Sequence, residues 1–166
     1  MHASKRAAVG CCALFLIGCV AKYVQPDESR ESATLTFVPG TGIRGSSAFT
    51  AYANPECTDG ANLGRLATLS LIRADSQTTR VLAGKELFIK SIWVNGSGTS
   101  CQPSYAPSAC LESCSLMNGF VPQPGSRYEV SVRAFNQRCQ LYIINTDAQV
   151  VESSVRAYPF AESCKR

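Results

Sequence analysis

Apolar and polar residues alternate strictly in one stretch of the chain, residues 128–134. There, Tyr, Val, Val and Ala alternate with Glu, Ser and Arg. A period of two residues places the apolar side chains on one face of an extended strand. Residues 139–143 continue the pattern after the sequence Asn-Gln-Arg at 136–138, a connection short enough for a hairpin. This stretch therefore favours an all-β domain in which a second layer covers the apolar face.

Further segments of the chain have the composition of strands. They are residues 33–37, 49–53, 66–72, 87–94 and 149–158. Clusters of Gly and Pro at residues 39–42, 95–98 and 122–125 separate them as turns. A helix competes over residues 61–73, but Gly64 and its β-prone neighbours disfavour it. We therefore expect a single antiparallel β-sandwich of about seven strands, of the immunoglobulin-like or transthyretin-like kind.

Six cysteines lie beyond residue 32 and predict a disulfide framework that staples the domain. They are Cys57, Cys101, Cys110, Cys114, Cys139 and Cys164. Many pairings are possible. We favour Cys101–Cys110 within a loop, Cys114–Cys139 between neighbouring strands, and Cys57–Cys164 tying the end of the chain back. The alternative is a zinc site that includes Cys101, Cys110 and Cys114, although their spacing lacks the paired Cys-x2-Cys knuckles of such sites.

The chain begins with the arrangement of a secretory signal. A cationic start with His2, Lys5 and Arg6 precedes an apolar run over residues 7–18. A transmembrane helix needs about 20 apolar residues, more than this run contains. An exported chain would meet an oxidising compartment, which agrees with the even number of cysteines in the domain.

The end of the apolar run, Leu16-Ile17-Gly18-Cys19, resembles the lipobox of bacterial lipoproteins. In that class the chain is cut before the cysteine, here between Gly18 and Cys19. The thiol carries diacylglycerol, and the new amino group receives an acyl chain such as palmitate. A residue other than Asp after the cysteine, here Val20, implies export to the outer membrane. Cleavage without lipidation, which would give a soluble secreted protein, is the alternative.

This resemblance implies three parts of the chain. Residues 1–18 would be a lipoprotein signal peptide, and residues 19–32 the lipidated Cys19 with a flexible tether. The tether lacks apolar periodicity and would span about 20 Å as a coil. Residues 33–166 would form one β-sandwich domain. We therefore expect a protein that is anchored in the lipid bilayer of the outer membrane through acylated Cys19, with its domain facing the periplasm.

Several short motifs lie at positions typical of one group of exported proteins. The chain has Asn54-x-x-Cys57, then Val-Leu-Ala-Gly-Lys at 81–85, and a cysteine before Phe-Val-Pro-x-x-Gly-x-x-Tyr at 120–128. Cys-x-Leu follows at 139–141. This pattern resembles small uncharacterised proteobacterial lipoproteins. The resemblance implies no assigned activity, and Cys101 and Cys110 depart from the pattern.

The residue types after the signal limit the chemistry that the domain can perform. The one histidine of the chain, His2, lies in the signal. The domain therefore lacks the base of Ser-His-Asp and Cys-His catalysis, and it lacks histidine as a metal ligand. Glu56 and Asp59 flank a cysteine in a turn, and Glu129 lies on an outward strand face, so we interpret them as solvated surface. We expect no catalytic residue, no metal and no cofactor.

The charge of the chain does not favour a nucleic-acid partner. Two of the 16 Lys and Arg residues precede residue 19, whereas all 12 acidic residues follow it. The remaining basic residues are scattered, among them Arg65 and Lys90, and we interpret them as solvated surface.

The segment 95–114 is the expected interaction surface. It is a long loop with three cysteines, several Gly and Pro residues, and Tyr105. Trp93 directly precedes it and could stack on a sugar, although a Trp between Ile92 and Val94 is more typical of a core. The function we expect is a non-enzymatic interaction or structural module with an envelope protein as partner. The alternatives are a carbohydrate- or peptidoglycan-binding module that uses Trp93 and Tyr105, and, below it, an enzyme or enzyme inhibitor.

Overall fold

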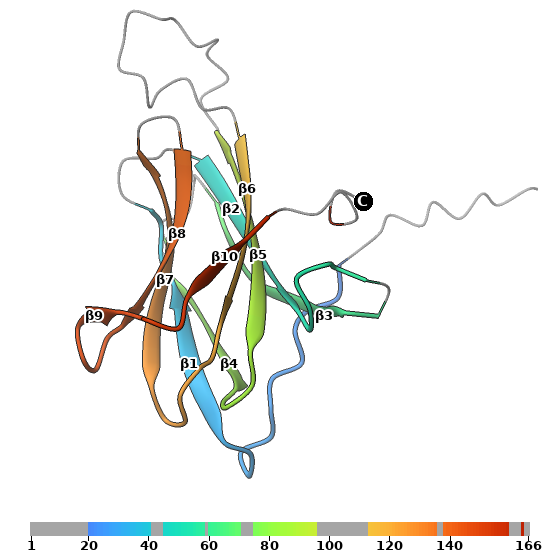
Figure 1. Cartoon of the computed structure of the whole chain (residues 1–166), viewed down its shortest axis with the longest axis vertical. Helices are drawn as coiled ribbons and strands as arrows, with labels where there is room; N and C mark the ends of the chain where they lie inside the picture. The colour runs from blue at the N-terminus through green and yellow to red at the C-terminus, as the bar shows by residue number, and fades with distance from the viewer. Residues whose placement is uncertain are drawn as a thin grey trace, which may run out of the picture.

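A computed structural model shows an all-β protein (Figure 1). It describes residues 20–40, 45–58, 60–70, 75–95, 113–135, 138–159 and 164. These residues form ten strands and no helix. The strands are β1 (Ser32–Phe37), β2 (Gly45–Tyr52), β3 (Asn62–Leu69), β4 (Gln77–Leu82), β5 (Leu87–Asn95), β6 (Ser113–Phe120), β7 (Arg127–Phe135), β8 (Arg138–Asn145), β9 (Val150–Val151) and β10 (Arg156–Tyr158).

The strands form two five-stranded sheets. The first sheet has the order β4-β1-β7-β8-β9, and the second has the order β10-β6-β5-β2-β3. Most neighbouring strands are antiparallel, but β1 pairs with β7 in parallel. The expectation of a purely antiparallel arrangement is therefore wrong at this pair. β1 lies between β4 and β7. Its pairing with β4 is antiparallel, whereas its pairing with β7, the first strand of the predicted hairpin, is parallel.

The two sheets share one hydrophobic core. The alternation predicted for residues 128–134 is present, because Tyr128, Val130 and Val132 are all buried in this core. Rings from the two sheets meet there: the centroids of Phe37 and Phe49 lie 4.7 Å apart. The buried Tyr128 hydroxyl accepts a hydrogen bond from the Gln123 backbone N–H at 2.9 Å. The polar end of this ring is thereby satisfied inside the core.

The sequence pattern predicted about seven strands, whereas the described residues form ten. β4 and β6 were not expected. β6 lies between β5 and β10 and is buried on both faces from Met117 to Phe120, so its side chains do not alternate in polarity. The predicted strand 149–158 is two short strands in different sheets, because the chain turns at residues 152–155.

One disulfide joins the two sheets. Cys114 of β6 is bonded to Cys139 of β8, with 6.3 Å between their Cα atoms. Both side chains pack against the shared core. This is the pairing that the sequence analysis favoured for these two cysteines, and it makes Cys114 unavailable as a zinc ligand.

The segment before β1 is part of the folded domain. Lys22 forms a parallel bridge with Arg65 of β3. The Tyr23 N–H donates to the Arg65 carbonyl at 3.0 Å, and the Arg65 N–H donates to the Ala21 carbonyl at 2.7 Å. Tyr23 is 9% exposed and belongs to the core. The interpretation of residues 20–32 as a flexible tether is therefore corrected over residues 21–23, because an edge strand and a core position hold them.

Near this segment, Pro26 is also fixed. The Arg80 guanidinium donates to the Pro26 carbonyl at 2.8 Å, and the Arg80 backbone N–H donates to the Gln25 side chain at 3.1 Å. Residues 21–26, which we call the docked N-terminal segment, thus reach from the edge of the second sheet to β4 of the first. Among the described residues, none forms a helix with the length and apolar character to cross a bilayer.

Candidate functional site

A second apolar cluster lies on the side of the second sheet that faces away from the shared core. Phe88 of β5, Met117 of β6 and Cys164 are its buried members. Phe88 is followed by the core residue Ile89, so the alternation of the strand directs Phe88 outward. Its ring meets the ring of Tyr158 edge-on at 5.3 Å. The end of the chain therefore covers part of the outer face of this sheet.

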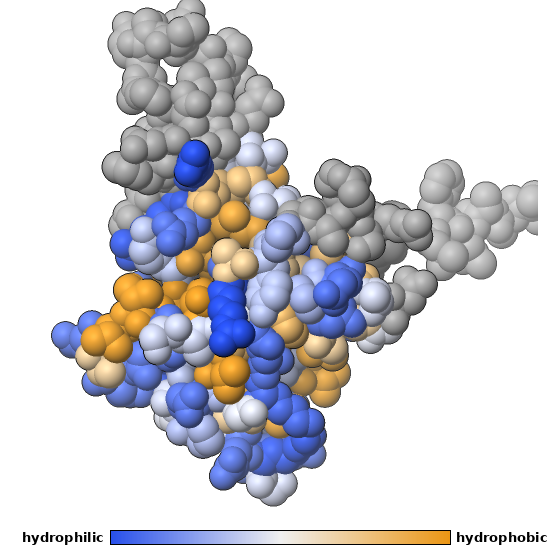
Figure 2. Space-filling model, in the orientation of Figure 1, coloured by the Kyte–Doolittle hydropathy of each residue, from blue (hydrophilic) through white to orange (hydrophobic). Residues whose placement is uncertain are grey.

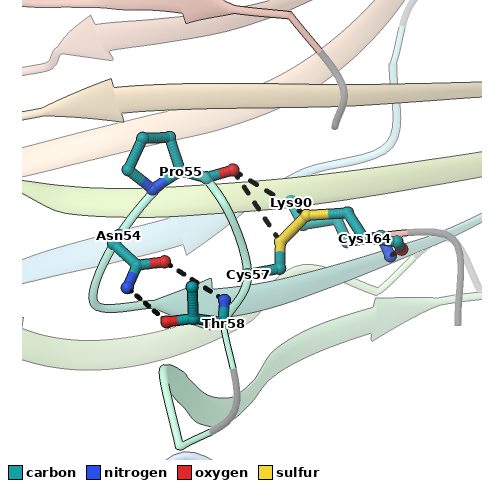
Figure 3. The surroundings of a disulfide bond; sticks show 6 residues. All are labelled: Asn54, Pro55, Cys57, Thr58, Lys90 and Cys164. Carbon is teal, nitrogen blue, oxygen red and sulfur yellow. Dashed lines mark hydrogen bonds between the residues drawn. A yellow bond between two sulfur atoms is a disulfide. The ribbon is translucent and has the colours of Figure 1, made fainter. Parts of the chain in front are cut away.

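A disulfide fixes this end of the chain to the loop after β2. Cys57 is bonded to Cys164, with 5.3 Å between their Cα atoms (Figure 3). This is the pairing that the sequence analysis favoured. The Pro55 carbonyl oxygen lies 4.0 Å from the sulfur of Cys57 and 3.8 Å from that of Cys164. Cys164 is 2% exposed, so the bridge is shielded from solutes on the side of the chain end.

The loop that presents Cys57 is held from within. The Asn54 side chain donates to the Thr58 hydroxyl at 2.7 Å and accepts from the Thr58 backbone N–H at 3.3 Å (Figure 3). Cys57 itself has a φ of 53°, in the left-handed region that non-glycine residues rarely occupy. Such a conformation persists where the surroundings fix it, and here the Asn54–Thr58 contacts do so.

A buried lysine lies beneath the bridge. Lys90 of β5 is 8% exposed, and its Nζ donates a hydrogen bond to the Cys164 carbonyl (Figure 3). The interpretation of Lys90 as solvated surface is therefore wrong. The strand directs its side chain to the outer face, but the end of the chain, which is 74 residues away in sequence, covers that face. Burial lowers the pKa of Lys90 from its usual 10.5, because a low-dielectric surrounding disfavours the charged form.

The lowered pKa of Lys90 predicts a pH dependence of stability. Between the folded pKa and the usual 10.5, the folded protein binds fewer protons than the unfolded chain, so the free energy of unfolding rises with pH in this window. Below the folded pKa both states bind the Lys90 proton, so the slope vanishes and the cost of burying the charge is present in full. We expect Lys90→Met to remove the rise, as measured by urea unfolding at a series of pH values from neutral to above 10.5.

Lys85→Met is the matched control for that series, because Lys85 is an exposed lysine in the turn before β5. Subtracting each variant from the unchanged protein removes the opposing contribution of Tyr23 and Tyr52, whose pKa values burial raises. Equal pH slopes for Lys90→Met and Lys85→Met would contradict the assignment.

The structure gives a mixed outcome for the other residues that the sequence singled out. Trp93 is 2% exposed and belongs to the shared core, so its ring is not presented to a sugar. Glu129 lies on β7 between core residues and is partly exposed. Cys19, Asp59, Cys101, Tyr105 and Cys110 lie outside the described residues, and so does most of the segment 95–114.

The geometry of this site is suited to a structural role, in which the end of the chain is fixed to the domain. A long-range disulfide, a buried cation and a small apolar cluster hold the end of the chain on one sheet face. Two hollows of about 220 Å³ and 240 Å³ lie elsewhere on the domain. Both are smaller than the roughly 300–1,000 Å³ of typical ligand pockets. No sequence signal located the Lys90–Cys164 contact, since the two residues share no motif.

Other apolar side chains are exposed on the surface. Val150 and Val151 of β9 are 55% and 60% exposed, and the space-filling view shows an apolar area where β9 lies (Figure 2). On β5, Ile92 and Val94 are 36% and 50% exposed. Exposed apolar side chains are normal when single, but neighbouring ones on strands are suited to contact with another protein.

Comparison of the chain with protein-family models found no match. Neither the curated proteins nor the solved structures gave a match.

Proposed function

We propose that the chain is a lipoprotein of the bacterial cell envelope, anchored through acylated Cys19 and acting as a non-enzymatic interaction or structural module. The observation that carries this proposal is Leu16-Ile17-Gly18-Cys19 after an apolar run, directly before a disulfide-bonded domain. The outer membrane, with the domain in the periplasm, is the proposed location. Val20 after the cysteine supports it.

The disulfides support export. All four cysteines among the described residues, Cys57, Cys114, Cys139 and Cys164, are in disulfides. Such bridges form and persist in oxidising compartments, including the bacterial periplasm. A reducing cytoplasm would leave a domain of this kind without two of its long-range links.

The proposed architecture is a single sandwich of the immunoglobulin-like or transthyretin-like kind. In its support, residues of both sheets belong to one core cluster, and Cys114–Cys139 joins the sheets. Small anchored sandwiches serve as parts of larger assemblies, an analogy at the level of the fold. The exposed valines of β9 and the end of β5 are surfaces that such a role could use.

The anchor is tested by Cys19→Ala in a Gram-negative host, followed by separation of membranes from soluble periplasmic contents. We expect the unchanged protein in the outer-membrane fraction and the variant released from it or left unprocessed. Cys12→Ala is the matched control, because this cysteine lies in the same apolar run and would be removed with the signal. A Cys19→Ala protein that is processed and stays membrane-bound like the control would contradict the anchor.

The interaction role is tested by photo-crosslinking in intact envelopes. A photoreactive residue at Val94 or Val151 is expected to give a defined protein adduct, whereas one at the buried Val130 is expected to give none. Adducts to peptidoglycan in place of protein would support the glycan-binding alternative.

A further inference from the structure

A small hollow lies where the docked N-terminal segment meets β3 and β4. Its volume is about 220 Å³, and it is lined by Val20, Lys22, Arg65, residues 66–68 and Gln77. The lining residues include two cations and no carboxylate. The side chains that line the hollow therefore carry a net positive charge.

The two cations lie directly opposite one another. Lys22 and Arg65 are partners in the parallel bridge, so their side chains leave neighbouring backbones at the same level. Like charges opposite each other in a sheet destabilise it. Within the described part of the chain, neither side chain forms an ion pair with a carboxylate. An anion between Lys22 and Arg65 would relieve this repulsion.

The Arg65 guanidinium also has donors to spare. Its Nη1 lies 3.4 Å from the Thr68 hydroxyl, while its Nε is shielded from solvent and has no acceptor among the described residues. A guanidinium carries five N–H donors in a planar fork that matches phosphate oxygens, and a lysine ammonium adds a compact charge. Arginine and lysine together are thus suited to one phosphate group.

The position of the hollow indicates which phosphate is available. Val20 lines it and is 41% exposed. Val20 directly follows Cys19, and the two peptide units from Cys19 to the docked Ala21 span at most about 7 Å. The exposed Val24 (84%) lies two residues after Lys22, and the exposed Leu63 (41%) lies two residues before Arg65. Apolar side chains around basic ones are typical of surfaces that rest on a membrane interface.

We propose that the hollow between Lys22 and Arg65 binds the phosphate of an anionic phospholipid headgroup and so orients the domain on the bilayer. This proposal rests on the proposed lipid anchor at Cys19, which would bring the hollow to the headgroups. The edge of the second sheet at β3 then faces the membrane. The end of the chain at Cys164 is fixed to the outer face of the same sheet.

The test uses the full chain, expressed in a Gram-negative host and purified in nonionic detergent in the form that the host produces. NMR would follow the Arg65 Nε–H and the Gly64 amide during titration with dihexanoylphosphatidylglycerol, dihexanoylphosphatidylcholine or inorganic phosphate. We expect saturable shifts with phosphatidylglycerol at lower concentration than with either other probe. Lys22→Gln combined with Arg65→Gln should weaken this binding at least about tenfold.

Lys85→Gln combined with Arg138→Gln is the matched control, because it removes the same charge from exposed positions on other elements. It should bind as the unchanged protein does. Lys22→Arg keeps the charge and should retain binding, and the single Lys22→Gln variant serves if the double variant does not fold. No saturable shift, equal weakening in both double variants, or tighter binding of inorganic phosphate would each overturn the proposal.

The mass of the same sample separates this proposal from the anchor. An acylated protein that does not bind phosphatidylglycerol would rule out the phosphate site and support the anchor. A protein that binds phosphatidylglycerol but lacks acyl chains on Cys19 would rule out the anchor and support the phosphate site.

Discussion

Replacing both Cys57 and Cys164 with serine is expected to lower the free energy of unfolding by about 5 kcal/mol. The two residues are 107 positions apart, so the bridge closes a very long loop of the unfolded chain. Cross-linking removes more chain entropy from the unfolded state as the loop grows. The variant also releases the end of the chain, which exposes Phe88 and Met117 and takes the Cys164 carbonyl from Lys90.

Equilibrium unfolding in urea measures this loss, with the fluorescence of Trp93 as the signal. Trp93 is the one tryptophan of the chain and is buried in the core, so its emission reports unfolding of the domain. Replacing Cys114 and Cys139 is the matched control, because their separation is 25 residues and the expected loss is smaller, about 3.5 kcal/mol. A loss below about 1 kcal/mol for the Cys57 and Cys164 pair would contradict the importance of this closure.

Gly64→Ala is expected to lower the free energy of unfolding by about 3 kcal/mol and to detach the N-terminal segment. Gly64 has a φ of 111°, and a Cβ there would lie 2.7 Å from the Tyr23 nitrogen and 2.8 Å from the Lys22 carbonyl carbon. Backbone atoms cannot yield as a flexible side chain does. The segment would therefore move away, losing its two hydrogen bonds to Arg65 and exposing Tyr23.

Hydrogen exchange at the Tyr23 amide, together with urea unfolding, measures this second effect. Gly84→Ala is the control, because Gly84 has a φ of 73° but open space around a Cβ. It adds backbone strain alone, about 1 kcal/mol. If Gly64→Ala costs no more than Gly84→Ala and the Tyr23 amide stays protected, the segment is not held at β3 in the way described.

The parts of the fold that could be predicted carry their signal locally. The alternation over residues 128–134 marked β7, and the short connection after it marked the pairing with β8. β6 escaped prediction because it is buried on both faces near its end and contains Asn118 and Gly119, which weaken any strand pattern. Tyr23 escaped because its burial depends on Gly64, 41 residues later, and on no feature of its own segment.

One part of the candidate site could also be predicted from the sequence, and another part could not. Pairing Cys57 with Cys164 was one of many possible connections, favoured because it ties the chain end back, and the structure contains it. The position of Lys90 under that bridge could not be predicted, since a lysine on an outward strand face is usually solvated. Its burial follows from the covering chain end, and only the three-dimensional arrangement brings the two together.

We propose above all that an acylated cysteine holds a disulfide-bonded β domain in the cell envelope. The most direct measurement is mass spectrometry of the purified protein, intact and after proteolysis without reduction. We expect a chain that begins at Cys19 carrying diacylglycerol and an N-linked acyl chain, with Cys57–Cys164 and Cys114–Cys139 bridged. A chain that begins at Met1, with an unmodified Cys19 and free thiols at those four positions, would contradict it.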